Sequence, residues 1–171
     1  LAPNYGAGYM RFSDFLFTQY RKGEAIEMID RARQLDPQTP TLHLRKAFLL
    51  MVSRSDVAGH DRLVHEALAI NPRLHPALVQ LALSRYEYSG EFADAVRIIE
   101  QSIALDPRSA FARYLAARTY LDVDDSAAAL SVLRDSQQPT ETLVEIAQYQ
   151  RDPSRAAELA RSRSATTWVG G

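Results

Sequence analysis

The chain has 171 residues, of which 46% are hydrophobic and 24% are charged, a balance typical of a folded globular domain and not of a disordered one. Its 20 basic and 21 acidic residues give a net charge of −1, which argues against direct binding of duplex nucleic acid, since that usually needs a strongly positive surface. The absence of cysteine excludes disulfide and thiolate chemistry, and no apolar run approaches the roughly 18 residues that a membrane-spanning helix requires.

The compartment is left open by these features. The first residues lack the basic and then apolar layout of a secretory signal peptide. A chain without cysteine fits the cytoplasm, which we favour, and a periplasmic domain is equally allowed.

A short motif recurs along the chain, in which an apolar residue is followed by Asp or Asn and then by Pro. It stands at 35–37, 70–72 and 105–107, so that its prolines are 35 residues apart both times. Leu1–Pro3 looks like a further copy, and Pro139 marks a weaker one. An internal period of this length is the signature of a repeat protein built from helical hairpins.

The residues between these prolines have the helical period, in two apolar-striped segments separated by a polar break. Proline lacks the N–H that a helix interior needs, so each proline marks an end or a first turn. Candidate N-caps are Thr39 before Pro40, Ser109, Asp125, and Asp152 before Pro153. In chain order the pattern predicts no strand and ten helices, at residues 4–20, 24–35, 40–53, 57–70, 75–88, 92–105, 109–122, 126–136, 140–150 and 153–163.

A lone helical hairpin cannot bury both of its apolar stripes, so the hairpins are expected to stack on one another. Close contact between helices then needs small residues at fixed points. Ala25 and Ala32 supply them in the second helix of the first repeat, and Ala95 and Ser102 occupy the matching places in the third.

These residues resemble the pattern of the tetratricopeptide repeat (TPR) family, which is W-x2-L-G-x2-Y, then A-x3-F-x2-A, then P. In the first repeat the slots carry Tyr9, Phe12, Ser13, Leu16, Ala25, Ile29, Ala32 and Pro37. Aligned back from Pro72, the second repeat fills them with Leu44, Ala47, Phe48, Met51, His60, Val64 and Ala67. The third has Val79, Ala82, Leu83, Tyr86, Ala95, Ile99, Ser102 and Pro107. The fourth matches at Ala116, Ala117, Tyr120, Ala129 and Leu133 and departs at Arg113.

The resemblance implies an all-α fold, a right-handed solenoid of stacked antiparallel helix-turn-helix repeats. It would cover residues 1–163 with about four repeats and a degenerate C-terminal hairpin, followed by a tail or linker at 164–171. The alternative is another helical-hairpin repeat. The spacing of 35 residues implies one extra residue between repeats, and His60 stands where the family pattern has a small alanine.

In the resembled family, partners usually lie along a concave groove formed by the first helices. A subset of the family binds the C-terminal carboxylate of chaperones with lysine and asparagine, but Asp14 and Lys46 occupy the asparagine slots here, so we do not expect that activity. Arg45 and Lys46 would give the groove a positive half beside a more acidic half from the third and fourth repeats. By this alignment the groove residues are Arg11, Asp14, Phe17, Arg45, Lys46, Leu49, Gln80, Ser84, Glu87, Tyr88, Tyr114, Arg118 and Asp122.

The other residues with chemical potential have structural interpretations. His60 and His65 are five residues apart, which does not place two metal ligands on one helix face, so the four histidines are expected in the core or at the surface. Gly6-Ala7-Gly8 lacks the preceding strand and following lysine of a phosphate loop, and it is expected within the first helix. The aspartates at 122, 124 and 125 suit a turn and an N-cap. We therefore predict no catalytic residue, metal or cofactor.

The predicted function is a non-catalytic scaffold that binds a partner protein or peptide in the groove. The alternative is a regulatory or sensory region of a larger protein, because Leu35 to Pro40 is similar to turns in repeat arrays of bacterial transcriptional regulators and nucleotide cyclases. If Leu1–Pro3 ends an earlier repeat, the first helix should expose apolar surface and the chain could self-associate through that end. The residues concerned are Phe12, Phe15, Leu16 and Phe17.

Overall fold

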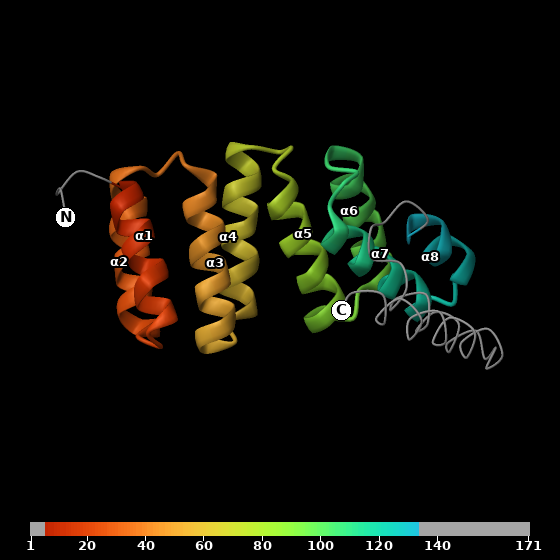
Figure 1. Ribbon diagram of the computed structural model, residues 1–171, viewed down its shortest axis with the longest axis horizontal. Coiled ribbons are helices and arrows are strands. Elements are labelled where there is room, and N and C mark those ends of the chain that lie inside the picture. The colour runs from red at the N-terminus through yellow and green to blue at the C-terminus, as the bar shows by residue number, and fades with distance from the viewer. Residues whose placement is uncertain (1–5, 134–171) are drawn as a thin grey trace, which may run out of the picture. The chain divides into compact units, whose positions relative to one another are not determined.

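The computed structural model describes residues 6–133, and these form eight α-helices and one π-helical turn, without a strand (Figure 1). Each predicted helix within this range is present, with ends that differ by a few residues at most. Several expectations lie outside the described residues: the motifs at Leu1–Pro3 and Pro139, the cap at Asp152, the helices at 140–150 and 153–163, and the tail at 164–171.

The chain divides into two compact units, and the first ends at Ser84. Within it, two hairpins stack, because α2 packs against both α1 and α3 while α3 packs against α4 (Figure 1). A fifth helix packs against α4. The helices are α1 (Gly6–Thr18), α2 (Lys22–Leu35), α3 (Pro40–Arg54), α4 (Val57–Ile70) and α5 (His75–Ser84).

The second unit begins at Arg85, where the chain changes from α-helix to π-helix. Its described elements are η1 (Arg85–Ser89), α6 (Phe92–Leu105), α7 (Ala110–Asp122) and α8 (Ser126–Leu133). α6 contacts η1 and α7, and α7 packs against α8. The contact between α7 and α8 is an apolar cluster built on Ala117, Leu121, Ala129 and Leu133.

The small residues predicted at helix contacts are buried. Ala25, Ala32 and Ser102 are fully inaccessible, and Ala95 is 1% exposed, so this prediction is confirmed. The first helices have a matching series of fully buried small residues, which identifies the glycine slot of the repeat pattern. The series is Ser13, Ala47, Ala82 and Ala117, with spacings of 34, 35 and 35 residues.

This series corrects the predicted register of the second and third repeats by one residue. The first-helix slot precedes the first small slot of the second helix by 12 residues in the first and fourth repeats (Ser13 to Ala25, Ala117 to Ala129). It precedes it by 13 in the second and third (Ala47 to His60, Ala82 to Ala95). The distance from the last small slot of a second helix to the next repeat's first-helix slot is a constant 15 residues, counted from Ala32, Ala67 and Ser102. The extra residue therefore lies in the hairpin turn, and the prediction that it lies between repeats is wrong.

The hairpin turns show how the extra residue is accommodated. Each turn contains a left-handed residue, at Tyr20, Ser55, Gly90 and Asp124, with φ of 60°, 52°, 67° and 60°. In the first turn the Arg21 N–H donates to the Leu16 carbonyl, five residues back. In the third, the Glu91 N–H donates to the Arg85 carbonyl, six residues back, across the π-helical turn. The wider turn holds one more residue without shifting the second helix.

The predicted N-caps are confirmed at two of the three described positions. Ser109 Oγ accepts from the Ala112 N–H at 3.3 Å, and Asp125 Oδ1 accepts from the Ala128 N–H at 2.9 Å. Thr39 precedes Pro40 as expected but makes no cap bond, because its hydroxyl donates to Asp36 Oδ2 at 2.5 Å. Asp56 is a cap that the pattern did not predict, and it accepts from the Gly59 N–H at 2.8 Å.

His60 is accommodated in the slot that usually holds alanine. It is 5% exposed, and its Nδ1 lies 3.0 Å from Asp61 Oδ1. The same carboxylate oxygen accepts a hydrogen bond from the Ser84 hydroxyl at 2.6 Å. The polar ring is therefore buried with a hydrogen-bond partner, and its burial carries little penalty.

Candidate functional site

The one-residue change of register alters which side chains the first helices present. A shift of one position turns a residue by about 100° around a helix axis, enough to move it from the surface into the core. Leu49 is fully buried, and Ser84 is 1% exposed and bonded to Asp61. Neither side chain can contact a partner, so their assignment to the groove is wrong.

The same shift brings two aromatic residues out of predicted core slots. Phe48 and Tyr86 are only half-buried, and each contacts an arginine from the predicted groove set. The missed signal is the distance of 13 residues, in place of 12, between the small slots of the second and third repeats.

The Arg45 cluster, which comprises Asp14, Phe17, Arg45 and Phe48, joins α1 to α3 in the first unit. The Arg45 guanidinium lies over both rings, 5.6 Å from the centroid of Phe17 and 5.2 Å from that of Phe48. The rings meet edge to face at 5.6 Å. Asp14 Oδ1 lies 2.6 Å from Arg45 Nε and neutralises its charge. Cation–π contacts and the ion pair hold this arginine from three sides.

Lys46 is also engaged within the first unit, because its Nζ donates to Asp30 Oδ1 of α2 at 2.6 Å. With both Arg45 and Lys46 paired, the prediction that they form a positive half of the groove is wrong. Beside this pair, Arg33 and His43 converge on Glu66 Oε2 of α4, at 2.9 and 3.1 Å. These charges link three helices and have a structural role.

The Arg118 cluster, which comprises Tyr86, Tyr114, Arg118 and Asp122, joins η1 to α7 in the second unit. The exposed Arg118 guanidinium lies over two rings, 5.5 Å from the centroid of Tyr86 and 5.9 Å from that of Tyr114. Its Nη1 is 3.5 Å from the Tyr114 hydroxyl. Asp122 Oδ2 accepts from the Tyr86 hydroxyl at 2.6 Å and forms no ion pair with Arg118. The structure thus brings together three predicted groove residues and one, Tyr86, that was assigned to the core.

The environment of this cluster affects its titration. Partial burial, together with the hydrogen bond to Asp122, raises the pKa of Tyr86 to about 12, so its hydroxyl remains a donor at neutral pH. The hydrogen bond with Tyr114 raises the pKa of Arg118 above its ordinary value, which keeps the guanidinium charged. The cluster therefore presents one fixed positive charge framed by two neutral phenol rings.

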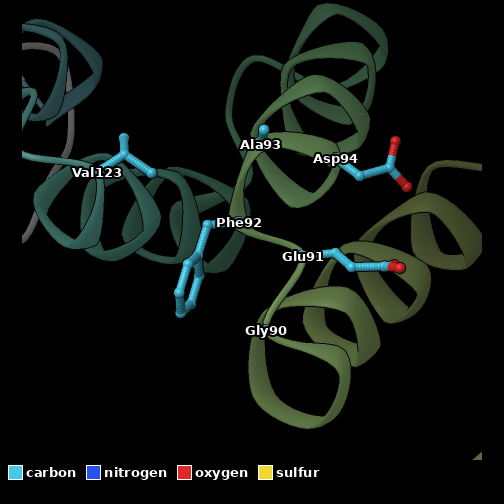
Figure 2. A pocket seen from close by; sticks show the side chains of 6 residues that line it. All are labelled: Gly90, Glu91, Phe92, Ala93, Asp94 and Val123. Carbon is cyan, nitrogen blue, oxygen red and sulfur yellow. The ribbon is translucent and has the colours of Figure 1, made fainter.

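A shallow, open depression of about 610 Å³ lies in the second unit beside this cluster (Figure 2). It is lined by residues 90–94 at the start of α6 and by Val123 after α7. In Figure 2 the Phe92 ring and Val123 lie on one side, while the carboxylates of Glu91 and Asp94 point away from them. The Phe92 ring meets the Tyr86 ring edge to face at 5.7 Å, so the depression adjoins the Arg118 cluster.

The remaining predicted groove residues are not part of either cluster. Arg11 is exposed on α1, and Gln80 is half-buried on α5. Glu87 and Tyr88 are exposed on η1, and the side chain of Tyr88 is 50% accessible. They remain predicted contact residues.

The residues given structural interpretations occupy matching places. His43 and His60 are buried, His65 is exposed and His75 is half-buried. Residues 6–8 form the first turns of α1. Within residues 6–133, no group of three or more His, Asp or Glu side chains is arranged to hold a metal ion. The helices in this range are too short or too polar to span a membrane.

Comparison with known sequences gives no match, either to the models of protein families or to individual curated proteins. Solved structures do match. PilW, a type IV pilus biogenesis factor, superposes with a TM-score of 0.81 and 16% identity over 99% of this chain and 81% of its own. TTC0263, a thermophilic TPR protein of Thermus thermophilus, gives 0.70 and 16% over 92% and 89%. The first TPR domain of Spaghetti (RPAP3), bound to the HSP90 peptide SRMEEVD, gives 0.64 and 17% over 72% and 97%.

These likenesses extend over most of the chain, and the matched structures share the pattern of helical hairpins seen in each unit. At 16 to 17% identity they establish the fold and leave the function to the chain's own residues. This chain has the tetratricopeptide fold of stacked antiparallel helix-turn-helix repeats.

Proposed function

We propose that this chain is a non-catalytic protein-interaction scaffold that holds a segment of a partner protein against its first helices. The observation that carries the proposal is the Arg118 cluster, in which an exposed arginine and two tyrosines are fixed in place on one surface. Arginine and tyrosine are the residue types that most often dominate binding energy at protein interfaces. Pre-ordered side chains also lose less entropy when a partner binds.

The fold supports this proposal. The TPR domain of Spaghetti was solved with a bound peptide, so an arrangement of helices similar to this one can hold an extended segment. The groups that would contact the partner here belong to this chain alone. They include Arg118 and Tyr114 on α7 and the exposed Glu87 and Tyr88 on η1.

Site-specific photo-cross-linking in the source cell tests the proposal. A photoreactive phenylalanine analogue replaces Tyr88 or Arg11 on the first-helix side of the repeats. Matched controls carry it at Glu27 of α2 and Gln101 of α6, which are exposed on second helices. We expect the first two positions to cross-link to the same partner protein and the controls to give none. Cross-links from Glu27 and Gln101 alone would place the partner on the second helices and contradict the proposal.

We also propose that α1 can mediate self-association, through a smaller patch than the four residues predicted. Leu16 is buried and Phe17 packs against Phe48, so only Phe12 and Phe15 remain, 36% and 54% exposed and stacked at 6.2 Å. Sedimentation should show concentration-dependent association that the double change of Phe12 and Phe15 to Ser removes. A chain that is monomeric at every concentration would contradict this proposal.

A further inference from the structure

The two arginine clusters offer a comparison that the chain makes within itself. Arg45 and Arg118 each lie over two aromatic rings, at 5.2 to 5.9 Å from the ring centroids. In the first cluster the arginine faces a carboxylate of the chain, and Asp14 Oδ1 lies 2.6 Å from its Nε. The Arg45 cluster therefore shows which ligand this arrangement accepts.

The second cluster lacks that ligand. Asp122 belongs to the same helix as Arg118, but it accepts the Tyr86 hydroxyl at 2.6 Å. Among residues 6–133, no carboxylate forms an ion pair with Arg118, whose polar contact is with the Tyr114 hydroxyl at 3.5 Å. The guanidinium is exposed, so its remaining N–H groups face solvent.

We propose that Arg118 binds an acidic side chain of the partner segment, and that an apolar side chain of the same segment occupies the adjoining depression at Phe92 and Val123. This inference rests on the proposed scaffold function and names the partner's chemistry. A guanidinium offers parallel N–H donors that match a carboxylate, and the flanking tyrosines keep its plane in position. Tyr86 contacts both Arg118 and Phe92, so the two subsites are adjacent.

The charge of the second unit narrows the partner further. Its described residues include five basic and eight acidic side chains, a net charge of −3. A strongly acidic segment would be repelled by this surface, whereas a single Asp or Glu can be held locally by Arg118. We therefore expect one acidic residue close to an aliphatic or aromatic one, and not a run of carboxylates.

Synthetic peptides and nuclear magnetic resonance of the full chain test this inference. The probes are acetylated and amidated glycine-rich peptides that carry one Leu and one Glu separated by one, two or three glycines. Matched peptides replace Glu with Gln or with Lys, and a fourth series lacks Glu but ends in a free carboxylate. Binding is followed through the Nε–Hε signal of Arg118 and the backbone signals of Phe92 and Val123.

We expect at least one Glu peptide to shift these signals, and its Gln counterpart to bind about tenfold more weakly, because a charge-assisted hydrogen bond is lost. Arg118→Gln should abolish the difference between Glu and Gln peptides. Arg118→Lys should keep only part of it, because an ammonium lacks the planar fork. The control is Arg108→Gln, an exposed arginine of the same unit, which should bind like the parent. Val123→Ser should weaken the Leu-containing peptide several-fold and leave a Leu-to-Gly peptide unchanged.

Equal binding of Glu and Gln peptides would overturn the assignment, as would a preference for Lys, which would point to the aspartates and glutamates of this unit. Binding of the free-carboxylate series alone would replace the acidic side chain with a chain terminus. If no peptide binds although photo-cross-linking succeeds at Tyr88, the carboxylate site is wrong and the scaffold function stands. All variants should retain the parent's helical circular dichroism.

Discussion

The Arg45 and Arg118 clusters use the same device on two parts of the repeat array and complete it differently. In the first unit the carboxylate comes from the chain itself, and Asp14 closes a cluster that joins α1 to α3. In the second unit the rings are tyrosines, and Asp122 bonds to one of them. The comparison teaches that an arginine held over aromatic rings serves packing or recognition according to where the nearest carboxylate lies.

The largest expected effect tests whether both units depend on the same small-residue contacts. Ala25→Arg in the first unit and Ala95→Arg in the second place an unpaired charge where a side chain is 0% or 1% exposed. Overpacking and a buried charge together should cost about 3 kcal/mol or more in either unit. Urea denaturation measures the loss, with Ala104→Arg on the exposed side of α6 as the control. A loss of less than about 1 kcal/mol in either variant, as for a surface change, would mean that the contact is not tight there.

A second prediction separates the clusters by pH, because only the second contains tyrosine. The pKa of Tyr86 is about 12 in the folded chain and 10.0 ordinarily, so between these values the unfolded chain has lost a proton that the folded chain keeps. Stability therefore falls as pH rises through this window, and the contribution is complete below pH 10. Burial also raises the pKa of Tyr120, whose hydroxyl bonds to Glu100, and this acts in the same direction.

Near-ultraviolet absorbance of tyrosinate measures this titration. Tyr86→Phe should remove one late-titrating group and cost about 1 kcal/mol at neutral pH through the lost hydrogen bond to Asp122. Tyr20→Phe, at a side chain that is 87% exposed, is the control. An unchanged alkaline titration in Tyr86→Phe would show that Asp122 does not hold this hydroxyl.

A third prediction concerns the ion pair that closes the first cluster. The side chains of Arg45 and Asp14 are 29% and 46% exposed, so solvent screens much of their attraction. A double-mutant cycle with Arg45→Gln and Asp14→Asn should give a coupling of about 0.5–1 kcal/mol in favour of folding. High salt should reduce this coupling. A coupling of zero at low salt would remove the basis for calling this cluster closed.

The smallest expected effect is the stability change on altering Arg118. Because its guanidinium is exposed and has no carboxylate partner among the described residues, Arg118→Gln should change the free energy of unfolding by less than about 0.5 kcal/mol. Urea denaturation of this variant beside Arg45→Gln gives the direct contrast. A larger loss for Arg118→Gln than for Arg45→Gln would reverse the roles assigned to the two clusters.

Most of the fold could be predicted from the sequence because its signals are local. Proline at 40 and the helical spacing of apolar residues placed α3 and α4 to within one residue. The buried slots at Ala25, Ala95 and Ser102 followed from the same spacing. Each of these features acts within a single hairpin, where the backbone geometry of a helix is fixed.

The site was less predictable because it depends on register. Counting back from Pro72 and Pro107 put the extra residue between repeats, and the groove positions of the second and third repeats moved by one. Leu49 was then assigned to the surface and Tyr86 to the core, and both assignments are reversed in the structure. No local signal marks a turn as one residue longer, because non-glycine residues such as Ser55 adopt the left-handed conformation there.

The sequence by itself thus determined a chain of helical hairpins with a period of 34 to 35 residues, since proline positions and apolar periodicity act on the local backbone. Only the tertiary structure decided which side chains leave the core and which charges find a partner. Arg45 and Arg118 are indistinguishable in a residue list. Whether an arginine is paired depends on the position of a carboxylate on another turn or another helix, which is set by packing between elements and not by the residues beside it.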